Sequence, residues 1–157
     1  MRLYLSPMEH TSALEIATWR YPPPYDFYNS LDQPASLAEY LIDPDNRFFQ
    51  LQDGSGVLVG YCCFGTEAQV PGGDYSAPAI DIGIGVRPDL TGRGEGMQYL
   101  QPVLEFARQL APNRPMRLSV ARFNQRAIRL YTKAGFRETQ RFYMLYSGRE
   151  FVVMVRT

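Results

Sequence analysis

The stretch that decides the fold is Val86 to Gly96, VRPDLTGRGEG, which joins a predicted strand to a predicted helix. Before it, residues 79–86 alternate between branched apolar side chains and Asp or Gly, as in a strand with one packed face and one nearly bare face. After it, apolar residues recur from Met97 to Leu110 at spacings of three and four, which predicts an amphipathic helix. A glycine-rich turn in this position presents main-chain amides at the positive end of the helix dipole, an arrangement that can hold a pyrophosphate.

Two common nucleotide-binding motifs do not fit this turn. A P-loop ends in Gly-Lys-Ser/Thr, whereas Gly96 is followed by Met97. A Rossmann fingerprint would need a glycine at position 97 and an early first strand. From these residues alone, a plain glycine-rich connection stays open as the alternative to a phosphate-binding turn.

The rest of the chain predicts a mixed α/β order of elements. Capping-box patterns at Ser12 with Glu15 and at Ser36 with Glu39 predict two short helices that begin at these serines. Pro102 lies within the long helix, where proline removes a backbone hydrogen bond, so a kink or a restart is expected there. Strands are predicted at residues 2–5, 48–52, 57–65, 79–86, 116–120, 142–146 and 151–155.

Length and composition predict one soluble, cytoplasmic domain over residues 1–157. Hydrophobic residues make up 45% of the 157 residues, which is enough for one core. Sixteen basic residues balance 16 acidic ones, so no global charge favours nucleic acid or a membrane as partner. The chain shows no apolar run of membrane-spanning length and no signal peptide at its start. The adjacent Cys62 and Cys63 are predicted to be reduced core residues, and no metal site is expected.

A second motif lies downstream at residues 124–136, NQRAIRLYTKAGF, in which residues 125–134 are predicted to form a short helix closed by Gly135 at the left-handed cap position. Together the two segments resemble the GCN5-related N-acetyltransferase (GNAT) family, whose pattern is Arg/Gln-x-x-Gly-x-Gly/Ala followed by Asn and then Tyr-x-x-x-Gly-Phe. Gly94 and Gly96 match the two small positions, and the second motif matches throughout. Thr91 stands where the family usually has Arg or Gln. By motif the resemblance covers about residues 80–136.

The resemblance implies both a fold and an activity. The fold is a central mixed, mostly antiparallel sheet of six to seven strands flanked by about four helices. The activity is transfer of the acetyl group of acetyl-CoA to a primary amine, on a small molecule or a peptide. A non-catalytic acyl-CoA sensor or interaction module of the same fold remains the alternative, and a homodimer is left open.

The resemblance also implies which residues bind acetyl-CoA. The pyrophosphate would rest on the turn of residues 91–96, the pantetheine arm would lie along residues 81–86, and Asn124 would hydrogen-bond that arm. The cofactor-binding residues implied in this way are Ile84, Gly85, Val86, Thr91, Gly92, Arg93, Gly94, Glu95, Gly96, Asn124 and Tyr131.

Three residues are candidates for catalysis. By resemblance, Tyr131 is the general acid that protonates the departing thiolate; the alternative is a tyrosine that packs against the sheet. Asp81 occupies the strand position where several family members carry a glutamate base, and its alternative is a carboxylate satisfied by the backbone or an arginine. Glu67, at the end of the preceding strand, is a second candidate base or else a solvated loop carboxylate.

The acceptor side is assigned to residues 19–28, WRYPPPYDFY, which are predicted to form an ordered loop or a very short helix. In the family, the loop between the first two helices lines the acceptor side. Aromatic side chains here would wall a pocket, and Asp26 would attract an ammonium group; the alternative is a proline-stiffened loop packed on the sheet. The aromatic residues of this prediction are Trp19, Tyr21, Tyr25, Phe27 and Tyr28.

Overall fold

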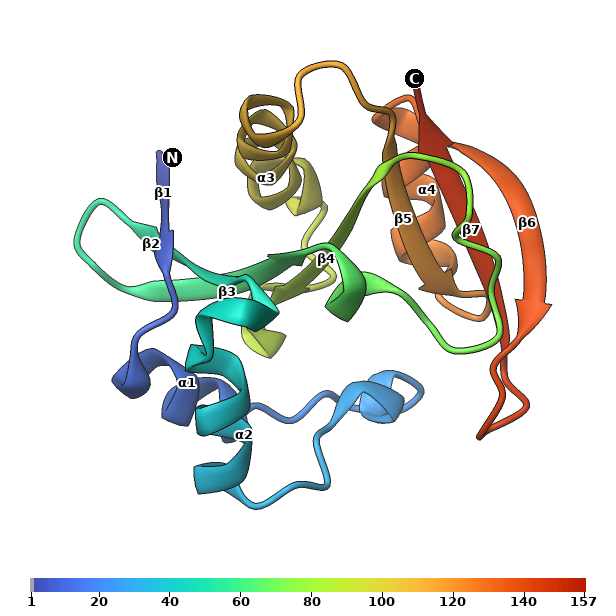
Figure 1. Ribbon diagram of the computed structural model, residues 1–157. Coiled ribbons are helices and arrows are strands. Elements are labelled where there is room, and N and C mark those ends of the chain that lie inside the picture. The colour runs from blue at the N-terminus through green and yellow to red at the C-terminus, as the bar shows by residue number, and fades with distance from the viewer. Residues whose placement is uncertain (1) are drawn as a thin grey trace. The chain divides into compact units, whose positions relative to one another are not determined.

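The computed structural model describes residues 2–157 and is built on a seven-stranded sheet in the order β1-β2-β3-β4-β5-β7-β6 (Figure 1). β4 and β5 run parallel, whereas β1–β2, β2–β3, β5–β7 and β6–β7 are antiparallel pairs. The strands are β1 (Leu3–Pro7), β2 (Phe48–Asp53), β3 (Leu58–Phe64), β4 (Ile80–Val86), β5 (Met116–Ala121), β6 (Arg137–Tyr143) and β7 (Glu150–Arg156). The helices of residues 2–157 are α1 (His10–Ala17), α2 (Pro34–Ile42), α3 (Gly96–Leu110) and α4 (Gln125–Lys133), together with short 3₁₀ turns. The predicted mixed sheet and its four helices are confirmed.

The chain divides into two compact units. The first contains Met1–Cys63 with Ile84–Pro102, and the second contains Phe64–Gly83 with Val103–Thr157. Both β4 and α3 therefore pass from one unit to the other along the chain.

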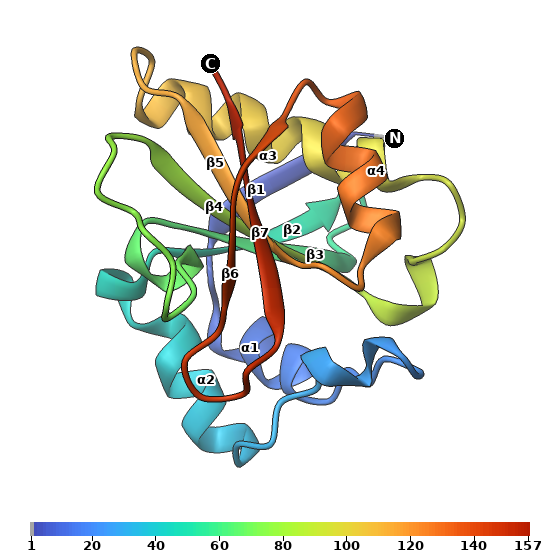
Figure 2. The same cartoon turned by 90° about the vertical axis from the view of Figure 1, so that its right-hand side faces the viewer.

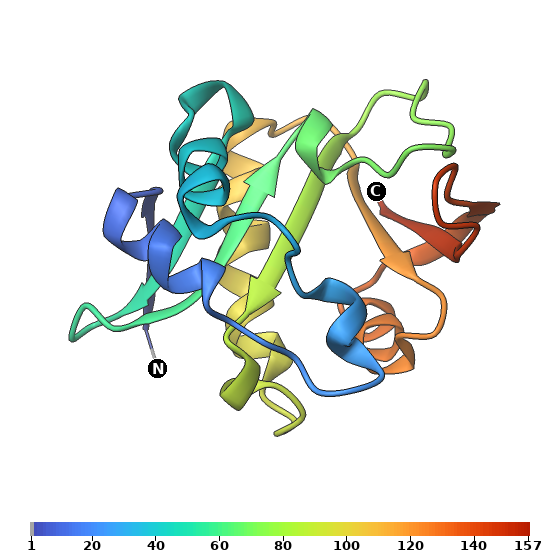
Figure 3. The same ribbon diagram turned by 90° about the horizontal axis from the view of Figure 1, so that it is seen from below.

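In the first unit, α1 and α2 lie side by side on one face of the β2–β3 hairpin, and the start of α3 lies on the opposite face (Figures 1 and 3). The hairpin pairs from Phe48↔Cys63 to Gln52↔Leu58, with a register shift between Leu51 and Gln52. The core between the helices and the hairpin contains Met8, Ala13, Ile16, Trp19, Ala38, Leu41 and Leu58. Cys62 and Cys63 are buried free thiols, as predicted.

Both predicted helix starts are wrong. α1 begins at His10 instead of Ser12, and Glu9 at its N-cap makes no side-chain cap; its amide donates instead to Gln50 Oε1 at 3.0 Å. α2 begins at Pro34 instead of Ser36. A proline in the first helical position already has the helical φ and lacks an amide that would need a partner, so it starts the helix ahead of the serine.

α3 is one helix from Gly96 to Leu110 with Pro102 inside it, so the helix does not restart at Pro102, and of the two expected outcomes only a kink stays a prediction. The apolar residues of the helix recur on one face and are buried, and this burial offsets the hydrogen bond that proline removes. The buried side chains of that face include Leu100, Val103, Leu104 and Ala107.

In the second unit, β5 pairs with β4 from Ile80↔Met116 to Ile82↔Leu118 and with β7 along its length. β6 and β7 form a long hairpin (Figure 2). The prediction of a strand at residues 142–146 is wrong, because β6 ends at Tyr143 and begins at Arg137. Of its residues only Phe142 is buried, so this edge strand lacks the apolar alternation that would reveal it in the sequence.

Candidate functional site

The glycine-rich turn follows β4 and leads into the first turn of α3. A short 3₁₀ helix, Pro88–Leu90, opens it, and the Thr91 hydroxyl donates to the Pro88 carbonyl at 2.7 Å. Arg87 anchors the start of the turn, because its Nη1 donates to the Leu58 carbonyl at 2.9 Å and its Nε to Asp89 at 2.7 Å. The bond to Leu58 holds the turn against the first residue of β3.

The centre of the turn requires glycine for its backbone conformation. Gly92 and Gly94 have φ of 72° and 74°, in the left-handed region that other residues avoid. Within residues 2–157, no main-chain hydrogen bond uses the amide of Gly92, Arg93 or Gly94 as donor, and all three residues are exposed. A Cβ built at Gly94 would meet no atom within 4 Å. The turn thus presents exposed amides and open space at the start of a 15-residue helix, which suits an anionic phosphate.

The alternation along β4 predicts a nearly bare face at Gly85. In the structure this face is covered at Gly85. The ring of Tyr61 from β3 lies over it, and a Cβ at Gly85 would come within 2.4 Å of the Tyr61 ring. The glycine therefore serves the close approach of an aromatic side chain from the neighbouring strand.

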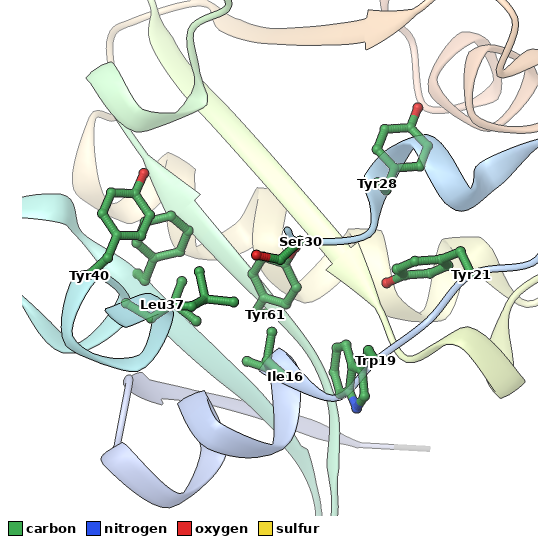
Figure 4. Close-up of a pocket in the computed structure, with 10 residues that line it drawn as sticks. Ile16, Trp19, Tyr21, Tyr28, Ser30, Leu37, Tyr40 and Tyr61 are labelled. Carbon is green, nitrogen blue, oxygen red and sulfur yellow. The ribbon is translucent and has the colours of Figure 1, made fainter. Parts of the chain in front are cut away.

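The same Tyr61 ring helps to line a pocket of about 150 Å³ in the first unit (Figure 4). Its walls come from α1, the loop after α1, α2, β2 and β3. Trp19 and Tyr61 have ring centroids 6.1 Å apart, and Phe48 lies 6.3 Å from Tyr61. The lining residues are Ile16, Trp19, Tyr21, Tyr28, Ser30, Leu37, Tyr40, Leu41, Phe48 and Tyr61.

The structure brings part of the predicted acceptor segment into this pocket. Trp19, Tyr21 and Tyr28 line it, whereas Tyr25 and Asp26 are outside the lining set and lie in the 3₁₀ helix Tyr25–Tyr28. That short helix confirms the ordered loop predicted for this segment. Sequence analysis missed the pocket residues contributed by α2, β2 and β3, because their apolar periodicity is that of ordinary core positions.

Tyr21 connects the pocket to β4. Its hydroxyl donates to the Val86 carbonyl at 2.6 Å, and its amide donates to Asn29 Oδ1 at 2.7 Å. Burial raises the pKa of the Tyr21 hydroxyl well above its ordinary value and raises that of Tyr61 to about 12. Both phenols are therefore neutral at physiological pH, and no Asp, Glu, Lys, Arg or His belongs to the lining set.

The second unit holds Asn124 and Tyr131. Asn124 is the N-cap of α4, where its Oδ1 accepts from the Ala127 amide at 3.1 Å. Tyr131, two turns later, is buried, and its ring centroid lies 6.3 Å from that of Phe136. Gly135 has φ of 95° after the end of α4, as the left-handed cap prediction requires.

Asp81 is buried in an ion pair with Arg117, the arrangement that sequence analysis gave as the alternative to a base. Arg117 Nε lies 2.6 Å from Asp81 Oδ1 and its Nη2 lies 2.8 Å from Oδ2, while Gln69 Nε2 donates to Oδ2 at 2.9 Å. The hydrogen bond to Asp81 raises the pKa of Arg117 further. Glu67 is exposed in the 3₁₀ helix Thr66–Ala68.

Comparison with known proteins finds similar N-acetyltransferases. The N-alpha-acetyltransferase RimI of Mycobacterium tuberculosis (strain ATCC 25618 / H37Rv) is 32% identical over 125 residues, which cover 78% of this chain and 73% of that protein. A chimera of the spermidine N-acetyltransferase SpeG from Vibrio cholerae and hSSAT has the same fold, with a TM-score of 0.75, 20% identity and coverage of 99% of this chain and 95% of that one. The spermidine/spermine N-acetyltransferase SpeG from Vibrio cholerae in complex with manganese ions gives a TM-score of 0.70 at 20% identity, over 98% and 91% of the two chains.

The family model described as the acetyltransferase (GNAT) family matches residues 12–136, which include the glycine-rich turn and the Asn124 to Phe136 motif. This match covers most of the chain, and we conclude that the chain belongs to the GNAT acetyltransferase family and is an N-acetyltransferase that acts on an amine.

Proposed function

We propose that the acetyl donor is acetyl-CoA and that the turn of residues 91–96 binds its pyrophosphate. The observation that carries this proposal is the set of exposed amides of Gly92, Arg93 and Gly94 beside the start of α3. The Arg93 side chain adds a positive charge at the same place. Because the amides are main-chain groups, Thr91 can stand in the position where the family usually has Arg or Gln.

Acetyl-CoA, when bound, supplies an activated thioester. In the proposed reaction Tyr131 donates its phenolic proton to the departing thiolate, and the side-chain amide of Asn124 holds the pantetheine arm. The burial of Tyr131 supports this role, because a hydroxyl shielded from bulk water can donate to the thiolate with little competition from solvent.

Of the two candidate bases, we propose Glu67. Both oxygens of Asp81 already accept hydrogen bonds from Arg117 or Gln69, so an incoming amine would have to displace one of these partners to reach the carboxylate. Glu67 is an exposed carboxylate, so it can take up a proton from the amine directly or through water.

The acceptor is a primary amine of a small molecule or a peptide, and the segment of residues 19–28 takes part in binding it. Because β4 and α3 are shared between the two units, we propose that the units act as one catalytic domain. In residues 2–157, no helix is long and apolar enough to cross a bilayer. The buried free thiols support a reducing compartment such as the cytoplasm.

The test is release of free CoA from acetyl-CoA in the presence of a panel of primary amines, with the acetylated amine identified by mass. We expect release that depends on both the amine and the enzyme. Tight binding of acetyl-CoA without any acetylated product across the panel would favour a sensor or interaction module instead.

A further inference from the structure

The pocket of the first unit has an almost entirely apolar and uncharged lining. Six of its lining side chains are aromatic and three are aliphatic, and Ser30 completes the set. It offers no carboxylate to pair with an ammonium group and no basic group to pair with a carboxylate. Burial holds the pKa of Tyr61 at about 12, which agrees with an environment that disfavours charge.

The size of the pocket limits what can fill it. A volume of about 150 Å³ matches that of an engineered apolar cavity that binds one benzene molecule. A phenyl ring or a branched four-carbon chain would fill this space, whereas a long chain would extend beyond it.

The pocket lies next to the part of β4 that leads into the glycine-rich turn. Tyr21 in its wall hydrogen-bonds the carbonyl of Val86, the last residue of β4, and Arg87 follows directly. Figure 4 shows the Tyr21 hydroxyl pointing toward this strand and Tyr61 near the centre of the lining residues. All of these residues belong to the first compact unit.

We propose that this pocket binds a compact apolar group carried by the acceptor, so that the preferred substrates are primary amines attached to a phenyl-sized or isobutyl-sized group. The inference rests on the proposed acetyl transfer and adds the substrate class. A polyamine is a poor acceptor here, because its second cationic group would lose water without gaining a carboxylate partner.

The chain provides its own reporter for occupancy of the pocket. Trp19 is the only tryptophan in the sequence, lines the pocket and is 9% exposed. Titration of the protein with 2-phenylethylamine or 3-methylbutylamine, with free CoA present, should change the tryptophan fluorescence to saturation. Spermidine, putrescine and tetramethylammonium should give no saturable change over the same concentrations. This readout needs no acetyl transfer.

Acetylation kinetics with the same amines provide the second readout. We expect kcat/KM for the two apolar amines to exceed that for spermidine and putrescine by about tenfold or more, as burial of one apolar group of this size permits. Leu37 is a lining residue on α2, so Leu37→Phe should fill the pocket and abolish this preference. Leu37→Ala should enlarge it and shift the preference from 3-methylbutylamine toward 2-phenylethylamine.

Ile42→Phe is the matched control. Ile42 lies on the same helix, is 37% exposed and is outside the lining set, so this variant should keep the wild-type preference. The thermal midpoint and the CoA affinity of each variant show whether it is folded. Preference is expressed as the ratio of kcat/KM between two amines measured on the same variant. If Leu37→Phe does not fold, Leu37→Ala alone decides the role of the pocket.

The outcomes separate the substrate class from the activity. Preference for spermidine or putrescine, saturation of the fluorescence by tetramethylammonium, or an unchanged ratio in both Leu37 variants would overturn the inference while leaving acetyl transfer intact. Saturation by the apolar amines without any acetylated product would support the pocket and overturn the proposed function.

Discussion

The ring of Tyr61 lies so close to Gly85 that a Cβ at Gly85 would be 2.4 Å from the Tyr61 Cε1 atom. The backbones of β3 and β4 also approach each other closely here, because a Cβ at Gly60 on β3 would lie 2.6 Å from the carbonyl oxygen of Gly85 on β4. Neither glycine is among those with positive φ, so each is required for space and not for its backbone conformation. The position of the Tyr61 ring in the aromatic pocket thus depends on the absence of a side chain on β4.

Gly85→Ala is expected to destabilise the protein by about 1–3 kcal/mol, because the added methyl group forces the Tyr61 ring out of its position. Urea unfolding measures the change. Gly54→Ala is the control, since a Cβ at Gly54 would meet nothing within 4 Å and the φ there is not positive. Equal stability of the two variants would show that Tyr61 moves aside without cost.

Coupling between the two residues can be measured directly. Tyr61→Leu removes the ring, so in this background Gly85→Ala should lower the free energy of unfolding much less than it does in the wild type. The double-mutant cycle should then show a coupling energy of about 1 kcal/mol or more. Additive effects would mean that the methyl group clashes with something other than the ring.

Gly94→Val should weaken the affinity for CoA by about tenfold or more, because a side chain there narrows the space before the exposed amides and strains a residue with φ of 74°. Gly148→Val is the matched control. Gly148 has φ of 70° and equally open surroundings but lies between β6 and β7. Both variants should lose similar stability, and calorimetry should detect a loss of CoA affinity in Gly94→Val alone. A similar loss of affinity in both would point to general strain.

The glycine-rich turn could be predicted from sequence because its signal is local. The left-handed glycines and the amides at the start of α3 follow from residues 91–96 and the helix after them, with no long-range contact. The same holds for α4, which Asn124 caps at one end and Gly135 closes at the other.

The pocket could not be predicted in the same way, since it depends on contacts between distant residues. Leu37 and Phe48 have the apolar pattern of core residues, and only the packing of α2 against the hairpin makes them walls of a cavity. Likewise, the ion pair between Asp81 and Arg117 joins residues 36 positions apart, and the sequence of neither strand indicates which residue is the partner of the other. The polar β6 was misplaced because an exposed edge strand needs no apolar face.

Tyr131→Phe should lower the rate of acetyl transfer by roughly 100-fold while leaving CoA affinity nearly unchanged, because it removes the proton donor and keeps the ring. Single-turnover measurements, in which chemistry limits the rate, provide the comparison. Thermal unfolding checks that packing against Phe136 is retained. A wild-type rate would assign the buried ring to packing alone.

Asp81→Asn should affect mainly the stability of the protein, whereas Glu67→Gln should affect mainly the pH dependence of the rate. Asp81→Asn leaves Arg117, which is 5% exposed, as an uncompensated buried charge and should cost about 3–5 kcal/mol of stability without changing the shape of the pH–rate profile. Glu67→Gln should leave stability nearly unchanged and depress the rate most at low pH, where neutral amine is scarcest. If Asp81→Asn changes the profile and Glu67→Gln does not, the base is Asp81.

The stability of the protein should fall as the pH rises from about 10 to about 12, because the pKa of Tyr61 is raised from 10.0 to about 12 in the folded state. Below this range the Tyr61 phenol is protonated in both the folded and the unfolded chain, so its full contribution to the free energy of unfolding is present. Within the range the unfolded chain releases the proton and the folded one keeps it, so the free energy of unfolding falls by about 1 kcal/mol per pH unit for this residue. Burial raises the pKa of Tyr21 and Cys62 as well, which steepens the loss.

Basic side chains contribute little to this effect, since Lys133 is the only lysine of the sequence and arginine keeps its proton throughout the range. Urea unfolding of the wild type and of Tyr61→Phe at about pH 9.5 and about pH 11.5 measures the slope. The variant should lose less stability between the two pH values than the wild type, whereas Tyr146→Phe, at a position that is 84% exposed, should follow the wild type. Parallel losses in all three proteins would mean that Tyr61 ionises as readily in the folded chain as in the unfolded one, and that its hydroxyl is not held in the neutral surroundings that the pocket requires.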